Sequence, residues 1–128
     1  MKPTVLKEVI KKEYVKCAQD PIYFMKKYCV VQHPMKGKVP FHLFEYQEQS
    51  LKEFEKHRFN VILKARQLGL STLTAGYSLW MMSFHADKNI LVIATKQDTA
   101  KNLVTKVRVM HANLPSWLKQ KCTEDNKL

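Results

Sequence analysis

The sequence is poor in the residues that would place it in several special classes of protein. Three glycines and five prolines in 128 residues exclude collagen-like and Pro/Gly-rich disordered chains. No apolar run approaches the roughly 18 residues that span a bilayer, and the first residues lack the apolar stretch of a signal peptide. Hydrophobic residues make up 45% of the chain. We therefore expect a folded, intracellular protein without a membrane span.

Cysteines and acidic residues are also scarce. Cys17, Cys29 and Cys122 are odd in number and far apart, which excludes a disulfide framework and a two-pair zinc site. We predict that they are packing residues. The chain has only 11 Asp and Glu but 22 Lys and Arg, so the formal net charge is +11. This excess favours a polyanionic partner or nucleotide phosphates, and solubility is the alternative explanation.

Apolar spacing predicts helices in the first half of the chain. Residues 6–17 form a basic amphipathic pattern, which we interpret as a solvated face over a core stripe rather than a DNA-binding helix. Asp20 precedes a proline and predicts the start of a short helix over 22–28. Another amphipathic helix is expected over 45–57. Two prolines and a glycine predict a loop at 33–40.

The pattern changes in the second half. Residues 60–64 and 90–94 are short apolar runs, typical of strands buried on both faces. Residues 70–85 are apolar nearly all round, which predicts a helix packed against a sheet. A further helix is expected over 98–110, opened by a capping box of Thr95 and Asp98. This order predicts an α/β fold in which 60–64 and 90–94 are neighbouring or near-neighbouring parallel strands joined by the helix.

The loop between the first predicted strand and its helix resembles a phosphate-binding pattern. Aligned on G-x-x-x-x-G-K-[ST], residues 64–71 place Gly69 and Ser71 as the pattern requires. Lys64 stands at the first glycine position and Leu70 at the usual lysine position, so the positive charge is moved rather than lost. Ser71 would give its hydroxyl to Mg²⁺, and Arg66 would stabilise transition-state charge. A simple turn between strand and helix is the alternative for Gly69.

Upstream, Tyr46 and Gln47 begin the predicted helix that leads into the strand. A glutamine side chain can bond both N6 and N7 of adenine. Together with the loop, the pair predicts a base reader followed by a phosphate cradle.

Three blocks, at 40–47, 64–73 and 93–100, resemble the large terminase subunit of tailed double-stranded DNA phages. The string Lys-Ala-Arg-Gln-x-Gly-x-Ser-Thr is the most specific part. The resemblance implies a partial P-loop NTPase sheet of the RecA-like kind flanked by helices, with an N-terminal helical segment at 1–44 and an incomplete ATPase domain at 45–128. It implies that Arg66 acts in cis on the γ-phosphate. The ATP-binding residues that it implies are Tyr46, Gln47, Lys64, Ala65, Arg66, Gln67, Leu68, Gly69, Leu70, Ser71 and Thr72.

The resemblance also implies a function. Members of this family hydrolyse ATP with Mg²⁺ to move viral double-stranded DNA into the procapsid, and they carry a downstream nuclease. The expected partners are that DNA, the portal protein, the small terminase subunit and further copies in a ring. The expected location is the host cytoplasm.

Carboxylates for ATP hydrolysis are missing after the loop. Asp87 falls in a predicted turn, and Asp98 in a predicted cap. We therefore expect a truncated chain that lacks the nuclease, binds ATP weakly and does not hydrolyse it alone. Two alternatives remain: a helicase-like nucleic-acid-dependent ATPase, which would normally keep lysine where Leu70 stands, and a non-catalytic basic DNA-binding module.

Overall fold

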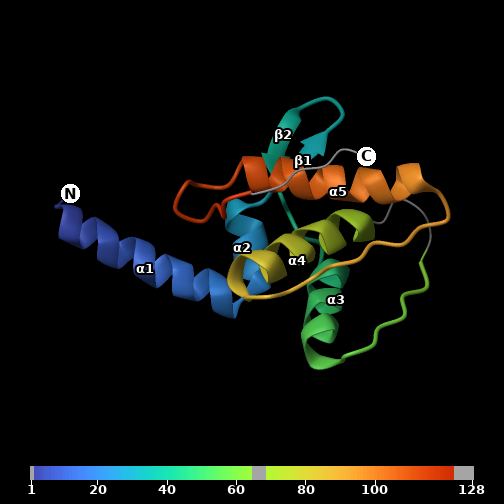
Figure 1. Ribbon diagram of the computed structural model, residues 1–128, viewed down its shortest axis with the longest axis horizontal. Helices are drawn as coiled ribbons and strands as arrows, with labels where there is room; N and C mark the ends of the chain where they lie inside the picture. Colours follow the sequence, from blue (N-terminus) through green and yellow to red (C-terminus); the bar gives the residue numbers. More distant parts are fainter. Residues whose placement is uncertain (1, 65–68, 123–128) are drawn as a thin grey trace.

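The computed structural model describes residues 2–64 and 69–122. Within these ranges the chain is mostly helical, with one small sheet (Figure 1). The elements in chain order are α1 (Pro3–Gln19), α2 (Pro21–Tyr28), β1 (Val30–His33), β2 (Gly37–Pro40), α3 (Glu45–Lys56), α4 (Leu70–Phe84) and α5 (Gln97–Ala112). No helix in these ranges has the length and apolar character that crossing a membrane requires.

The predicted helices form, apart from one cap, but the core stripe expected along α1 does not, because Cys17 is the only buried residue of that helix. Asp20 caps α2 through its carboxylate, which accepts from the backbone N–H of Ile22 at 2.9 Å and of Tyr23 at 3.3 Å. The capping box at Thr95 and Asp98 is wrong. The N-cap of α5 is Lys96, which makes no side-chain capping bond, so Thr95 lies one residue outside the position that the box requires.

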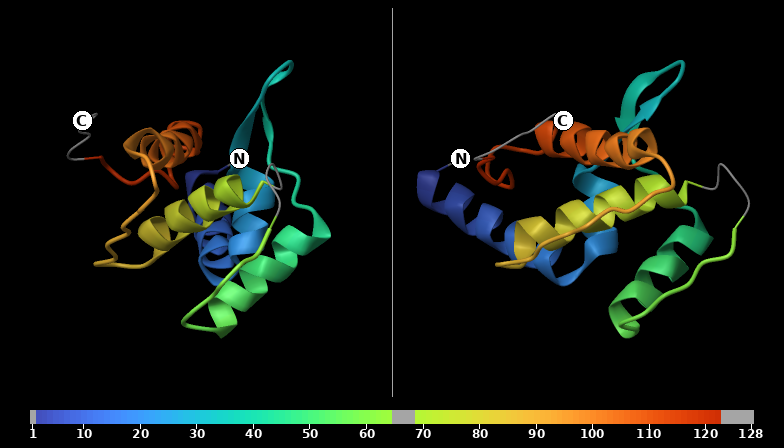
Figure 2. Two further views of the ribbon diagram at one scale, coloured as in Figure 1. Left: turned by 90° about the vertical axis from the view of Figure 1, so that its right-hand side faces the viewer. Right: turned by 45° about the vertical axis from the view of Figure 1, so that its right-hand side comes forward.

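The predicted α/β fold, with a partial P-loop NTPase sheet, is wrong. Neither 60–64 nor 90–94 forms a strand. In the part of the chain that the structure describes, the sheet consists of β1 and β2 alone, and these two strands are antiparallel. The chain between α4 and α5 instead runs back alongside α4 as an irregular segment (Figures 1 and 2).

The failure of the strand prediction has a physical cause. A buried parallel strand needs hydrogen-bonding neighbours and cover on both faces. Here Val61 and Leu63 are fully exposed, and Leu91 and Ile93 are more than 80% exposed. The apolar surface of α4 packs against α2, α3 and α5 rather than against a sheet. Apolar composition thus marked these segments as strands, but no partner covers them in the described residues.

The loop predicted at 33–40 is partly wrong, because β1 and β2 form a hairpin there. The register pairs Val31 with Val39 and His33 with Gly37, which leaves 34–36 as the tip. Gly37 has a φ of +72°, the left-handed region that suits glycine. One proline lies in the tip and the other ends β2, so neither removes a hydrogen bond from the middle of the ladder.

The core surrounds α4, which lies in the middle of the helices (Figure 1). Gly76 allows close contact with α2, since a Cβ there would meet Sδ of Met25 at 3.1 Å. The indole N–H of Trp80 donates to the backbone carbonyl of Cys17 at 2.8 Å and ties α4 to α1. The buried apolar side chains include Cys17, Phe24, Met25, Cys29, Leu51, Leu73, Ala75, Leu79, Trp80, Met110 and Leu118.

Two of the three cysteines are the packing residues that we predicted. Cys17 and Cys29 are buried, and burial raises the pKa of Cys17 to about 11 and that of Cys29 to about 12. Both thiols stay protonated near neutral pH and act as small apolar side chains. Cys122 is exposed, so the prediction is wrong for this residue.

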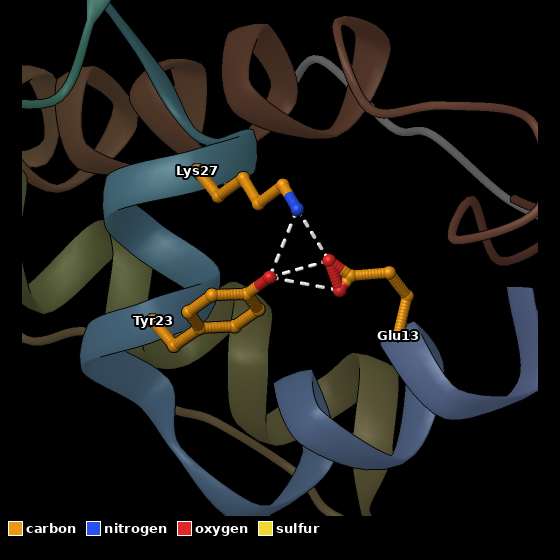
Figure 3. Close-up of polar contacts among 3 residues, drawn as sticks. All are labelled: Glu13, Tyr23 and Lys27. Atoms are coloured by element: carbon orange, nitrogen blue, oxygen red, sulfur yellow. Dashed lines mark hydrogen bonds and ion pairs between the residues drawn. The ribbon is translucent and has the colours of Figure 1, made fainter. Parts of the chain in front are cut away.

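A polar cluster joins α1 to α2 (Figure 3). Glu13 on α1 forms an ion pair with Lys27 on α2 and accepts a hydrogen bond from the Tyr23 hydroxyl, whose Oη lies 2.8 Å from Glu13 Oε2. Lys27 Nζ also donates to the Tyr23 hydroxyl at 2.9 Å. The hydrogen bonds from Lys27 and then from Tyr23 lower the pKa of Glu13 below its ordinary value of 4.5.

The lowered pKa of Glu13 predicts an acid-sensitive contact between α1 and α2. Its stabilisation is present above pH 4.5 and is lost as the pH falls through the lower pKa of the folded state. As the pH is lowered below 4.5, we expect the thermal midpoint of the wild-type protein to drop more steeply than that of Glu13→Gln. Glu8→Gln, an exposed change on the same helix, should keep the wild-type pH profile. Equal profiles for wild type and Glu13→Gln would contradict the role of this cluster.

Candidate functional site

Gln47 connects the two motifs that the sequence pointed to. It lies in the first turn of α3 and is 2% exposed. Its Oε1 accepts from the backbone N–H of Phe44 at 2.9 Å, and its Nε2 donates to the carbonyl of Gly69 at 3.2 Å. The predicted base reader and the predicted phosphate loop therefore meet in space, although they are separated along the chain.

The same bonds limit what Gln47 can do. Both polar atoms of its side chain are bonded to backbone groups, and the side chain is nearly inaccessible. A two-pronged contact with adenine would require Gln47 to release both partners. In this conformation its role is to hold α3 against the start of α4.

Aromatic rings lie beside Gln47 at the start of α3. Tyr46 is 41% exposed and Phe44 is 65% exposed, and the two rings stack with centroids 5.7 Å apart and planes 9° from parallel. An exposed ring face of this kind can stack on a nucleobase. Phe44 was missed as a site residue, although an aromatic residue two positions before Tyr46 was a usable signal.

Gly69 is the N-cap of α4 and has two reasons to be glycine. Its φ of +71° lies in the left-handed region. A Cβ at this position would also lie 2.8 Å from Nε2 of Gln47. Gly69 therefore permits both the backbone turn and the contact with Gln47.

The predicted loop residues in the first turn of α4 differ in their exposure to solvent. Ser71 is exposed and Thr72 is half-buried, whereas Leu70 is 7% exposed and belongs to the core. Free backbone amides at a helix start attract anions. Because the side chain of Leu70 is buried, the residue at the usual lysine position is a packing residue and cannot contact phosphates.

Of the remaining loop residues, Lys64 alone lies within the described part of the chain. Lys64 is exposed at the end of the segment that follows α3. The predicted transition-state residue Arg66 lies outside the described residues, as do Ala65, Gln67 and Leu68.

A small groove adjoins the first turn of α4. It has a volume of about 230 Å³, and Thr72 lines it together with Val31, Thr105, Lys106 and Met110. Typical ligand pockets measure roughly 300–1,000 Å³, so the groove is too small for a whole nucleotide. The sequence did not indicate Lys106 as a groove residue, because its place there depends on how α5 packs.

The described residues offer little for a resident metal. They contain no group of three or more His, Cys, Asp or Glu side chains that could hold an ion. The exposed hydroxyl of Ser71 is one oxygen ligand. Mg²⁺ commonly keeps several waters and takes further oxygens from substrate phosphates. The site therefore fits Mg²⁺ only as a companion of bound phosphates.

Substitution of Gly69 tests this junction between α3 and α4. Gly69→Ala should lower the free energy of unfolding by about 1–2 kcal/mol from the left-handed backbone, with a further loss from displacing Gln47. Gly37→Ala is a matched control, because Gly37 has nearly the same φ but a Cβ there would meet nothing within 4 Å. Urea unfolding of both variants measures the difference. Equal losses would show that the Gln47 contact adds nothing.

The chain matches no protein-family model. The terminase resemblance therefore depends on its motifs alone.

Proposed function

We propose that this chain is the ATP-binding part of a DNA-packaging motor of the large-terminase type, which hydrolyses ATP to move viral double-stranded DNA. The observation that carries the proposal is the hydrogen bond between Gln47 and Gly69. It supports the proposal because both motifs that resemble the family lie together at the start of α4.

Each part of the nucleotide has a candidate partner at this junction. The phosphates would meet the backbone amides of Ser71 and Thr72, with Lys64 and Lys106 as cations. Bound Mg²⁺ would neutralise charge on the phosphates, and the Ser71 hydroxyl would be its protein ligand. The base would stack on Tyr46. In the complete motor, Arg66 would meet the charge that develops on the γ-phosphate.

A non-catalytic DNA-binding module is the second candidate. It is favoured by the net charge of +11 and by the lack of a carboxylate cluster in the described part of the chain. A helicase-like ATPase is less favoured, because the usual lysine position is held by Leu70 in the core. Nucleotide binding separates the first candidate from the second.

Titration of the protein with a fluorescent ATP analogue and Mg²⁺ tests nucleotide binding. We expect weak binding by the wild-type chain, and a roughly tenfold or greater loss for Lys64→Ala, since a hydrogen bond to a charged group contributes about 1.5–3 kcal/mol. Lys88→Ala removes the same charge at another exposed position and should bind like the wild type. Absence of binding by the wild type, or equal affinity of the Lys64 variant, would reject the proposal.

A further inference from the structure

The β1–β2 hairpin is a projection with a cationic surface. It extends away from the helices, while its root packs against α5 and α2 (Figures 1 and 2). Lys36 and Lys38 are exposed, and Met35 at the tip is 91% exposed. A methionine so open to water contributes nothing to the core. The hairpin therefore presents an exposed methionine at its tip, followed by Lys36 in the tip and Lys38 on β2.

Hydrogen bonds hold the shape of the tip. The backbone N–H groups of Met35 and Lys36 both donate to Nδ1 of His33, each at 3.1 Å. Behind the tip, the strands pair in register, and Lys38 lies opposite the exposed Gln32. The backbone that carries Met35 and the two lysines is thus set before any partner binds, which lowers the entropy cost of ordering the hairpin.

The surroundings of the hairpin attract a polyanion. Residues 21–44 contain no Asp or Glu. At the root, Lys106 of α5 lines a groove together with Gln32 of β1, which places a further cation at the base of the hairpin. The sole acidic residue of α5 is Asp98, in its first turn. A protein partner would need a strongly acidic surface to match, whereas duplex DNA carries one charge per roughly 1.7 Å of its axis.

We infer that the hairpin is a contact surface for double-stranded DNA, with Lys36 and Lys38 on phosphates and Met35 against base steps in the minor groove. Apolar side chains such as Met act as wedges in the minor groove, and flanking cations bind the backbone. Because the proposed function supplies the choice of duplex DNA, this inference deepens that proposal and assigns its DNA contact. It does not require bound nucleotide.

The test is binding of the whole chain to a labelled 30-base-pair duplex, measured by fluorescence anisotropy at several salt concentrations. Each phosphate contact contributes roughly 0.9 to the slope of log affinity against log salt. Lys36→Ala with Lys38→Ala should therefore reduce the slope by about 2 and weaken binding roughly tenfold or more. Met35→Ala should weaken binding and reduce duplex bending, measured by end-to-end energy transfer, without changing the slope.

The control is Lys52→Ala with Lys56→Ala, which removes the same charge from exposed positions on α3, away from the hairpin (Figure 1). It should keep nearly the wild-type slope. An equal loss in both double variants would show that net charge alone binds DNA, and an unchanged slope in the hairpin variant would show that the hairpin makes no contact. Either result overturns the inference, as does a wild-type chain that does not bind the duplex.

ATP-analogue titration on the same samples distinguishes failure of the ATPase proposal from failure of the DNA-contact inference. The hairpin variants should retain the nucleotide affinity of the wild type, since neither lysine lies at the junction of α3 and α4. DNA binding that depends on the hairpin in a chain that binds no nucleotide would reject the ATPase proposal and leave this inference standing.

Discussion

Replacing Trp80 with alanine is expected to lower the free energy of unfolding by about 3–5 kcal/mol. Trp80 is 5% exposed, stacks on Tyr77 at 5.6 Å and contacts His85 edge-on at 4.9 Å. The change removes this packing, leaves a cavity beside α4 and breaks the hydrogen bond to the carbonyl of Cys17, which keeps only the backbone N–H of Asp20 as a donor at 3.4 Å. A loss of this size is a large fraction of the 5–15 kcal/mol typical of a domain. Urea unfolding followed by circular dichroism measures it.

Two further variants help to interpret the effect of Trp80→Ala. Trp80→Phe keeps an aromatic ring but loses the donor to Cys17, and should cost about 1 kcal/mol for the hydrogen bond together with a packing loss. Trp117→Ala removes a tryptophan that is only partly buried and packs edge-on against Tyr28 at 5.4 Å, so its cost should be smaller. If Trp80→Ala and Trp117→Ala cost the same, α4 is not the centre of the core.

Gln47→Ala should destabilise the protein and loosen the start of α4. The change strands the N–H of Phe44, and the carbonyl of Gly69 loses one of its two donors but keeps the backbone N–H of Leu73 at 3.0 Å. A stranded buried group costs about 1–3 kcal/mol and a lost hydrogen bond about 1 kcal/mol, and because both bonds are only partly buried we expect about 2 kcal/mol in total. If the junction binds nucleotide, affinity for the ATP analogue should fall as well. Urea unfolding and the titration measure the two effects.

Gln47→Glu tests the hydrogen bond donated to Gly69 by itself. A carboxylate can accept from Phe44 but cannot donate to Gly69, whereas the neutral acid can do both. The variant should therefore be less stable than wild type at neutral pH and recover part of the loss at acid pH. Gln49→Ala, on the same helix but exposed, should change stability by less than about 0.5 kcal/mol. A similar loss for Gln49→Ala and Gln47→Ala would remove the junction from the candidate site.

The candidate site could be foreseen only in part. Gln47 and Gly69 were identified as members of two motifs, because residue type and spacing carry that information. Their contact could not be foreseen, since it depends on how α3 packs against α4. The groove that Lys106 lines could not be foreseen for the same reason, since it depends on how α5 packs. The pattern also assigned Gln47 to adenine, whereas its side chain is bonded to backbone groups.

Local chemistry was enough to predict the helices. The 3.6-residue period of apolar side chains and the Asp20 cap act over one or two turns, so the chain near each residue contains the information. The irregular chain at 60–64 and 90–94, the β1–β2 hairpin and the junction at Gln47 depend instead on partners distant in sequence. An apolar run becomes a strand only where another strand supplies hydrogen bonds, and here α4 packs its apolar surface against helices.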